Sequence, residues 1–299
     1  MDREKKVIAL GFFDGVHKGH ASLLKKTTEV AKRYGAVPSV ITFDEHPGSL
    51  VEGHKMELIT SPEDRAEVIR RYFSINEIIV VHFDDIMMHM HWEDFINWLV
   101  GDFSAIHFVA GHDFRFGYKG RGNPENLTAK CAELGIGCDI MPKVTLDGIT
   151  ISSTYIRTLL KEGKIEKANA FLGHPHSLSG TVHFGYKLGR NIGAPTINMN
   201  FPDNVLIPAH GVYAVSLHIE EEPETHYAVT NIGVRPTVSG EGSVTVESFI
   251  MNFKRNVYGK HVRLEFHKML RPEMKFDSVE ELKRQIQMDV RAVKDYFGL

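Results

Sequence analysis

The spacing of apolar positions changes near residue 175 and divides the chain into two parts. In the first part, short apolar runs alternate with longer segments whose apolar residues recur at the spacing of a helix face. We expect strands at residues 6–13, 37–43, 77–83, 105–111 and 138–144. We expect helices at residues 21–35, 61–73, 91–100, 125–135 and 154–163. This alternation predicts an α/β domain with a parallel sheet, in which ligands bind at the carboxyl ends of the strands.

In the second part the apolar runs are shorter, and turn residues recur between them. The runs at residues 180–184, 211–219, 226–233, 244–251 and 261–270 predict an antiparallel barrel or sandwich. Residues 278–297 have the periodicity of an amphipathic helix that begins with a capping box. A segment containing proline and glycine separates the parts. We therefore expect domains at residues 1–172 and 183–299, joined by a linker at residues 173–182.

The composition narrows the class of protein. The 299 residues suffice for two domains, and 42% of them are hydrophobic, which allows a sizeable core. The formal net charge of -3 argues against binding to nucleic acid or to a membrane surface. The sequence also has no signal-peptide pattern and no apolar segment long enough to span a bilayer. These features predict a soluble cytoplasmic protein. The sequence does not reveal its oligomeric state, and we expect a monomer or a weak homo-oligomer.

The motif GFFDGVHKGH follows the first predicted strand and carries the first candidate chemistry. Gly11, Gly15 and Gly19 allow the backbone to turn sharply and to approach a ligand closely. His17 and His20 lie at the start of the next helix, whose free N–H groups favour a phosphate. Imidazole donors beside such an anion can stabilise charge on a phosphoryl group. An ordinary glycine-rich turn with two exposed histidines is the alternative for this motif alone.

A second polar turn, ISSTYIR, opens a later helix of the same predicted domain. Ser152, Ser153 and Thr154 offer hydroxyl and N–H groups. Arg157 follows three residues after Thr154, so its guanidinium can reach phosphate oxygens at the same helix end. Taken alone, the segment fits a Ser/Thr helix cap with a solvated arginine. Two polar turns at strand-to-helix junctions of one domain favour a phosphate site.

The second domain begins with a basic, glycine-rich loop that includes Gly185, Lys187 and Arg190. Such a loop can cover nucleotide phosphates, although its spacing also fits an ordinary charged hairpin. Thr196 and Asn198 follow, two residues apart, and would lie on one face of an extended segment. Their side-chain oxygens are ligands of the kind that Mg²⁺ prefers.

Glu247 lies on a predicted strand among apolar and β-branched neighbours. A carboxylate at the rim of a ligand site can accept a hydroxyl proton, which makes Glu247 a candidate general base. An exposed glutamate on an alternating strand is the competing interpretation.

These motifs carry a resemblance to a known family. HKGH and ISSTYIR resemble the nucleotidyltransferase superfamily, and FFDGVHKGH, TFDEHP and GHDFRFG narrow the likeness to bacterial FAD synthetase. The glycine-rich loop, PTIN, NIGVRPT, VESF and NVYGK resemble the riboflavin kinase module in the same order. The chain is thus similar to bifunctional riboflavin kinase/FMN adenylyltransferases. The resemblance implies a Rossmann-like α/β nucleotidyltransferase domain followed by a small antiparallel Greek-key β-barrel with a C-terminal helix.

The resemblance also implies roles for residues in the first domain. His17 and His20 would bind ATP phosphates and stabilise adenylyl transfer, while phosphates would be held from the other side by Ser152, Ser153 and Arg157. Asp113 and Asn123 would lie near the flavin–nucleotide pocket. Phe12 stands where many members have asparagine, which we interpret as a change in the pocket wall.

In the second domain, the resemblance implies that Thr196 and Asn198 serve ATP–Mg²⁺ and that Glu247 is the general base for the ribityl 5′-hydroxyl. Tyr186 and Asn252 replace acidic residues that are common in the family, so kinase efficiency is an open question.

The implied reactions are ATP-dependent phosphorylation of riboflavin to FMN and adenylylation of FMN to FAD, with Mg²⁺ as cofactor. The partners are accordingly riboflavin, FMN, FAD and ATP. Two alternatives stay open at this point. One is an adenylyltransferase with a degraded kinase barrel, and the other is a flavin-binding regulator without turnover.

Overall fold

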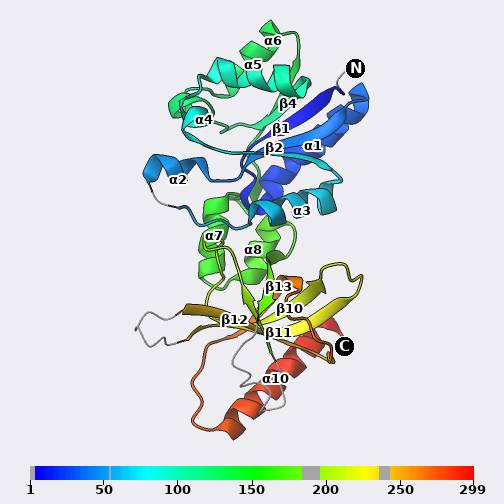
Figure 1. The fold of residues 1–299 in the computed structure, drawn as a ribbon, viewed down its shortest axis with the longest axis vertical. Helices are drawn as coiled ribbons and strands as arrows, with labels where there is room; N and C mark the ends of the chain where they lie inside the picture. Colours follow the sequence, from blue (N-terminus) through cyan, green and yellow to red (C-terminus); the bar gives the residue numbers. More distant parts are fainter. Residues whose placement is uncertain (1–3, 54, 184–195, 236–242) are drawn as a thin grey trace. The chain divides into compact units, whose positions relative to one another are not determined.

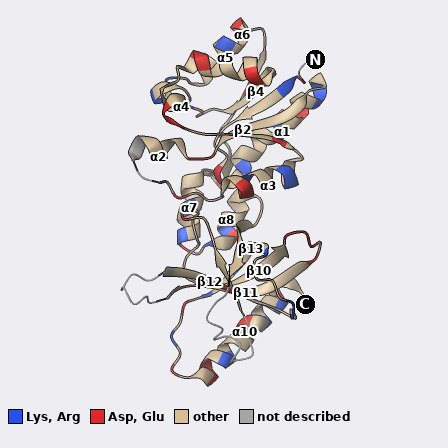
Figure 2. Cartoon of the chain, viewed as in Figure 1, with Lys and Arg blue, Asp and Glu red and all other residues tan. Residues whose placement is uncertain are grey.

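The computed structural model describes residues 4–53, 55–183, 196–235 and 243–299. The chain divides into two compact units, Met1–Ser153 and Thr154–Leu299, and each is described by itself. Basic and acidic side chains are interspersed over both units (Figure 2). In the described part of the chain, no helix is both long and apolar enough to cross a membrane.

The first unit contains a five-stranded parallel sheet in the order β3-β2-β1-β4-β5 (Figure 1). Its strands are β1 (Lys6–Leu10), β2 (Val37–Phe43), β3 (Glu77–Val81), β4 (Ala105–Gly111) and β5 (Gly137–Met141). Its helices are α1 (Lys18–Tyr34), α2 (Pro47–Glu52), α3 (Pro62–Phe73), α4 (Asp85–His89), α5 (Trp92–Phe103) and α6 (Pro124–Glu133). Short 3-10 turns, η1 (Asp14–Val16) and η2 (Tyr118–Gly120), and a hairpin of β6 (Thr145–Leu146) and β7 (Ile149–Thr150) complete the unit.

Alternation along the central strand explains why both faces of this sheet are covered. Val7 and Ala9 of β1 belong to a buried cluster that includes residues of α1 and α3. Ile8 and Leu10 point to the opposite face and pack in a cluster with residues of α5 and α6. The expected α/β fold is confirmed.

The second unit contains a closed six-stranded antiparallel barrel in the order β10-β11-β12-β9-β8-β13. Its strands are β8 (His176–His183), β9 (Ile197–Asn200), β10 (Gly211–Ile219), β11 (Thr225–Arg235), β12 (Ser243–Ile250) and β13 (His261–Pro272). The helices are α7 (Ser153–Lys161), α8 (Ile165–Leu172) and α10 (Val279–Phe297). Val293 and Phe297 of α10 pack against Val212, Ala214 and Val229 on the outside of the barrel. The expected barrel and C-terminal helix are confirmed.

Residues 173–182, which the sequence suggests as a linker, largely form part of β8. This strand pairs with β13 on one side and β9 on the other. Its long-range pairing overrides the local signals of Pro175 and Gly180, which by themselves suggest a loop. The compact units divide at Ser153, and the division of activities at residue 172 stays a prediction.

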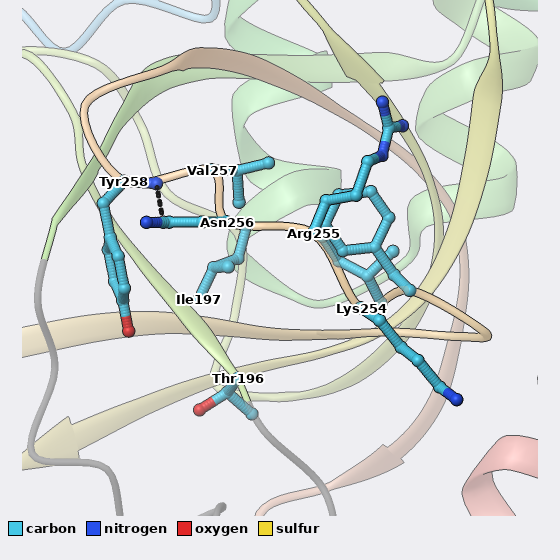
Figure 3. A pocket seen from close by; sticks show the side chains of 9 residues that line it. Thr196, Ile197, Lys254, Arg255, Asn256, Val257 and Tyr258 are labelled. Atoms are coloured by element: carbon cyan, nitrogen blue, oxygen red, sulfur yellow. Dashed lines mark hydrogen bonds between the residues drawn. The ribbon is translucent and has the colours of Figure 1, made fainter.

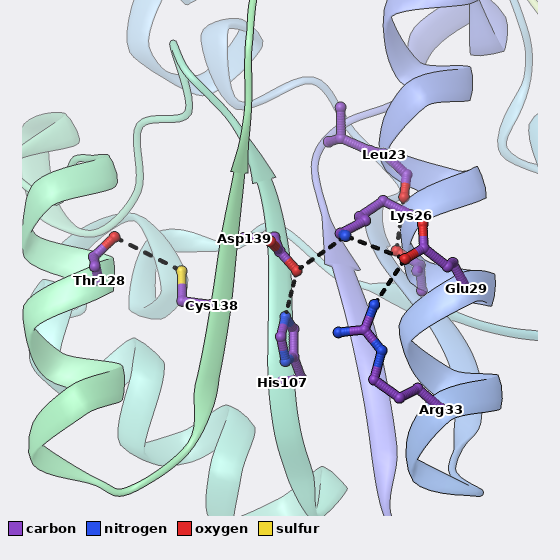
Figure 4. A network of polar contacts seen from close by, with 9 residues as sticks. Leu23, Lys26, Glu29, Arg33, His107, Thr128, Cys138 and Asp139 are labelled. Atoms are coloured by element: carbon purple, nitrogen blue, oxygen red, sulfur yellow. Dashed lines mark hydrogen bonds and ion pairs between the residues drawn. The ribbon is translucent and has the colours of Figure 1, made fainter.

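A polar network joins β4 and β5 to α1 on one face of the sheet (Figure 4). Asp139 accepts a hydrogen bond from His107 Nε2 at 2.9 Å and lies 4.0 Å from the Lys26 ammonium. A Cβ at Gly137 would stand only 2.0 Å from His107 Nδ1, so glycine is required for this packing. We interpret this network as a brace for the sheet rather than as a site.

Candidate active sites

The turn between β1 and α1 has an unusual backbone that is held by distant residues. Phe13, Gly15 and Val16 have positive φ angles of 59°, 74° and 42°. Left-handed geometry is costly for a β-branched residue and persists only where surrounding contacts enforce it. The buried Asp14 carboxylate supplies such contacts, because it accepts hydrogen bonds from the Ile59 and Thr60 N–H groups at 2.8 and 3.1 Å.

His17 is a buried N-cap of α1. Its Nδ1 accepts a hydrogen bond from the His20 N–H at 3.2 Å, so the neutral ring carries its proton on Nε2. That Nε2–H can donate to an anion at the helix start. A Cβ at Gly19 would approach the His17 ring to 3.0 Å, which explains the glycine between the two histidines.

His20 stacks on His17 with ring centroids 3.6 Å apart and an interplanar angle of 10°. Burial lowers the pKa of His20 well below 6.5, and the neighbouring His17 and Arg65 lower it further. Its Nδ1 is sealed from solvent and lacks a hydrogen-bond partner among the described residues. His20 is therefore neutral near pH 7 in the ligand-free protein, and a bound phosphate would favour its protonation.

The second polar turn is tied to the first. Ser153 Oγ donates a hydrogen bond of 2.9 Å to the main-chain carbonyl of Asp14. The two turns border a cavity of about 630 Å³ that also takes residues from the TFDEHP and GHDFRFG segments. Seven predicted site residues line this cavity: Gly11, His17, Gly19, His20, Asp113, Ser152 and Ser153.

The other predictions for this site have different outcomes. The Gly15 N–H donates to Thr60 Oγ1 at 3.0 Å and thus braces the turn. Asn123 caps α6 by accepting from the Asn126 N–H at 2.8 Å, and it is not among the cavity residues. Thr154 and Arg157 lie in the first turns of α7, in the second unit. The roles predicted for Asn123, Thr154 and Arg157 stay predictions.

The sequence analysis did not single out Asp14 or His46. Asp14 fixes the strained turn, and its place inside the FDGVH motif was the available signal. His46 lines the cavity and caps α2, because its Nδ1 accepts from the Gly48 N–H at 3.0 Å. Its signal was the TFDEHP segment directly after a predicted strand.

In the barrel, strand register brings the kinase candidates together. Glu247 of β12 is paired with Asn198 of β9 on one side and with Asn231 of β11 on the other. Directly paired residues of antiparallel strands share a face and lie close together. Asn198 is buried, whereas Glu247 is half-buried. The sequence analysis did not single out Asn231, although it opens the NIGVRPT stretch.

A second cavity, of about 520 Å³, lies beside the start of β9 (Figure 3). Thr196 and Ile197 line one part of it, and residues 253–258 line another. The loop is braced internally, since the Tyr258 N–H donates to Asn256 Oδ1 at 3.0 Å. Arg255 anchors it through an ion pair of 2.9 Å with Glu222. Gly185, Lys187 and Arg190, together with Tyr186, lie outside the described residues.

Comparisons with known proteins match both parts of the chain. A family model described as FAD synthetase matches residues 1–155, and one described as riboflavin kinase matches residues 172–297. A solved structure titled as a macrolide-efflux protein from Streptococcus pneumoniae is 29% identical, with a TM-score of 0.87. It covers 98% of this chain and 95% of its own.

Two full-length relatives are named bifunctional riboflavin kinase/FMN adenylyltransferase. The protein of Listeria monocytogenes is 36% identical over 98% of this chain and 93% of its own length. That of Bacillus subtilis is 34% identical over 99% of this chain and 94% of its own length. The resemblance inferred from the motifs is therefore confirmed, and the chain belongs to the bifunctional riboflavin kinase/FMN adenylyltransferase family.

Proposed function

We propose that this chain phosphorylates riboflavin to FMN in its barrel unit and adenylylates FMN to FAD in its α/β unit, with ATP as donor in both steps. The observation that carries the adenylylation proposal is the stacked pair of His17 and His20 at the start of α1, in one cavity with Ser152 and Ser153.

In the adenylyl transfer, an FMN phosphate oxygen attacks the α-phosphorus of ATP, and pyrophosphate leaves. Catalysis of such a transfer depends on positioning and on charge stabilisation. His17 donates from Nε2, and His20 becomes a stronger donor as the anion favours its protonation. Ser152, Ser153 and Arg157 are proposed to hold phosphate oxygens, with Gly11 and Gly19 allowing close backbone approach.

In the phosphoryl transfer, Glu247 accepts the proton of the ribityl 5′-hydroxyl while that oxygen attacks the γ-phosphorus of ATP, and ADP leaves. The register beside Asn198 and Asn231 supports this assignment, because two amide side chains can orient the carboxylate. Thr196 and Asn198 supply neutral oxygen ligands that fit Mg²⁺, which neutralises phosphate charge when bound. Mg²⁺ dependence and a cytoplasmic location belong to this proposal.

Flavin separation tests the proposal directly. Purified protein is incubated with ATP and Mg²⁺ and either riboflavin or FMN, and the flavins are separated by chromatography. We expect FMN and then FAD from riboflavin, FAD from FMN, and pyrophosphate release only in step with FAD. FAD from FMN without FMN from riboflavin identifies a degraded kinase barrel. Flavin binding without any product identifies a regulator.

A further inference from the structure

The first unit buries a charged side chain to which the proposed adenylyl-transfer steps assign no contact. Arg65 of α3 is completely excluded from solvent. Its Nη1 donates to Thr42 Oγ1 at 2.7 Å and to the Phe43 carbonyl at 2.8 Å. Within the described part of the chain, Nε and Nη2 have no hydrogen-bond partner. A buried charge with unsatisfied donors is unfavourable for folding, so a compensating role is expected.

The guanidinium remains charged in this setting. Burial lowers the pKa of Arg65 to about 10, and the nearby carboxylates of Asp14, Glu63 and Asp44 oppose that shift. At neutral pH the side chain is therefore a cation, and an aromatic face is one of the few groups that can stabilise it without hydrogen bonds.

Phe12 provides that face. The Arg65 guanidinium carbon lies 4.1 Å from the centre of the Phe12 ring. The main chain of Phe12 is held by the same arginine through Thr42, whose hydroxyl donates to the Phe12 carbonyl at 2.8 Å. Arg65 thus constrains both the ring and the backbone of Phe12 at the carboxyl end of the sheet.

The Phe12 ring in turn lines the adenylyl-transfer cavity. It meets the His46 ring edge-on, with centroids 4.7 Å apart and an angle of 74°. Phe43 and Pro47 line the same cavity, which makes this part of the wall largely apolar and aromatic. Such a wall suits a planar ring system, which binds by stacking and by exclusion of water.

The position of this wall favours the flavin over the adenine. HKGH and ISSTYIR are the segments that resemble nucleotidyltransferases in general, whereas TFDEHP belongs to the segments that narrow the likeness to the flavin branch. Phe12 contacts His46 of TFDEHP, so the wall continues into the flavin-specific segment.

We propose that Arg65 is a positioning residue that fixes the Phe12 ring as the wall for the isoalloxazine of FMN, which makes Phe12 a specificity-determining residue. The inference rests on the proposed adenylyl transfer in this cavity. Arg65 acts through Phe12 and touches no reacting atom.

The test measures adenylyl-transfer kinetics for Phe12→Leu, Arg65→Met and the double variant. Each single change should raise KM for FMN about tenfold, while kcat and KM for ATP change less than about twofold. The double variant should be no worse than the worse single variant, because both changes remove the same wall. Phe12→Tyr should raise KM for FMN less than Phe12→Leu does, and Arg65→Lys should recover part of the loss caused by Arg65→Met.

Controls separate this inference from the proposed function. Arg70→Met changes an exposed arginine of the same helix and should leave the kinetics unaltered. Tryptophan fluorescence of each preparation reports whether the first unit is folded, because Trp92 and Trp98 both lie there. If Arg65→Met does not fold, the same comparison is made with Arg65→Lys, Phe12→Leu and the double variant that combines these two changes.

Three results would overturn the inference. Multiplicative losses in the double variant would show that Arg65 acts independently of Phe12. A rise in KM for ATP instead of FMN would place adenine at this wall. A fall in kcat with both KM values unchanged would assign Arg65 to the transition state. Unchanged FAD synthesis in His17→Ala would instead remove the proposed function itself, whatever the Arg65 variants show.

Discussion

The two candidate sites are built in different ways. The histidine pair of the adenylyl-transfer site comes from one short segment, since His17 is the N-cap of α1 and His20 lies in its first turn. The kinase row, which consists of Asn198, Glu247 and Asn231, is brought together by strand register. Glu247 is 49 residues from Asn198 and 16 residues from Asn231, so the three meet only through strand pairing. The sequence spacing therefore already indicates that the two histidines of the first site lie close together. The residues of the second site stand in separate motifs, and the sequence spacing does not indicate that they meet.

The two sites also differ in how much backbone strain they require. The first site depends on a strained turn, in which Phe13 and Val16 adopt left-handed angles and buried hydrogen bonds to Asp14 hold them. The kinase row needs no such strain, because barrel pairing alone sets its positions. Substitutions in the first site should therefore act through both chemistry and preorganisation, and those in the second mainly through chemistry.

Glu247→Gln should give the largest effect and should act on one activity only. Glutamine keeps the size of the side chain, so the strand pairing with Asn198 should survive. It cannot accept the ribityl proton, and loss of a general base typically reduces a rate by about 10²–10⁴-fold. The measurements are kcat for FMN formation, the riboflavin dissociation constant, and FAD formation from supplied FMN, the last two of which should stay near wild type. A kcat within about threefold of wild type would remove Glu247 from the mechanism.

His17→Ala should produce the converse separation. Loss of one donor to a developing oxyanion costs about 3–4 kcal/mol in comparable sites, or roughly 10²–10³-fold in rate. We expect FAD synthesis to fall by this factor while riboflavin phosphorylation is unchanged. The control is His112→Ala, a cavity histidine outside the stacked pair. Near-normal FAD synthesis in His17→Ala would reduce His17 to a helix cap.

Local signals in the sequence predicted much of this fold. Ser61 and Ser278 begin the segments predicted as helices at residues 61–73 and 278–297, and their hydroxyls accept from the Asp64 and Glu281 N–H groups at 3.0 and 3.1 Å. The resemblance to a known family added the barrel type and the roles of the site residues. Local patterns predicted a strand from residue 180, whereas β8 begins at His176, because its pairing with β13 overrides a proline and a glycine.

Contacts between residues that are distant in sequence explain the features that the sequence analysis did not predict. In the sequence, Arg65 is one charged position on a predicted helix. In the structure it is buried against Phe12, which lies 53 residues earlier. The family resemblance predicts that Asn123 lies near a pocket, and in the structure its side chain caps α6. In both cases local composition is compatible with several environments, and only packing between elements decides among them.

The barrel contains a buried histidine that should make its stability sensitive to acid. His176 of β8 is buried, and burial lowers its pKa to about 3, with a smaller contribution from His174. The unfolded chain binds this proton below about pH 6.5, whereas the folded barrel binds it only near pH 3. Stability is therefore complete above pH 6.5 and falls as the pH drops toward 3, by about 2 kcal/mol between pH 7.5 and pH 5.

His176→Leu should flatten this pH dependence of the barrel, as measured by urea unfolding followed by far-UV circular dichroism. Trp92 and Trp98 both lie in the first unit, so their fluorescence gives a reference transition that the substitution should not move. His261→Leu changes an exposed histidine of β13 and is the matched control. An unaltered pH slope in His176→Leu would assign the acid sensitivity to other groups.

Ser153→Ala should give the smallest effect, and it probes the tie between the two turns of the first site. The substitution removes the hydrogen bond from Ser153 Oγ to the Asp14 carbonyl, and a bond of this kind contributes about 1 kcal/mol. We therefore expect kcat/KM for FMN adenylylation to fall about fivefold, with riboflavin phosphorylation unchanged. Ser153→Thr keeps a hydroxyl at this position and should retain more activity than the alanine variant. A wild-type rate in Ser153→Ala would show that the tie is incidental. A loss above about a hundredfold would show that the Ser153 hydroxyl itself contacts the reacting phosphates, whereas the expected fivefold loss leaves the proposed phosphate binding at this turn to its N–H groups.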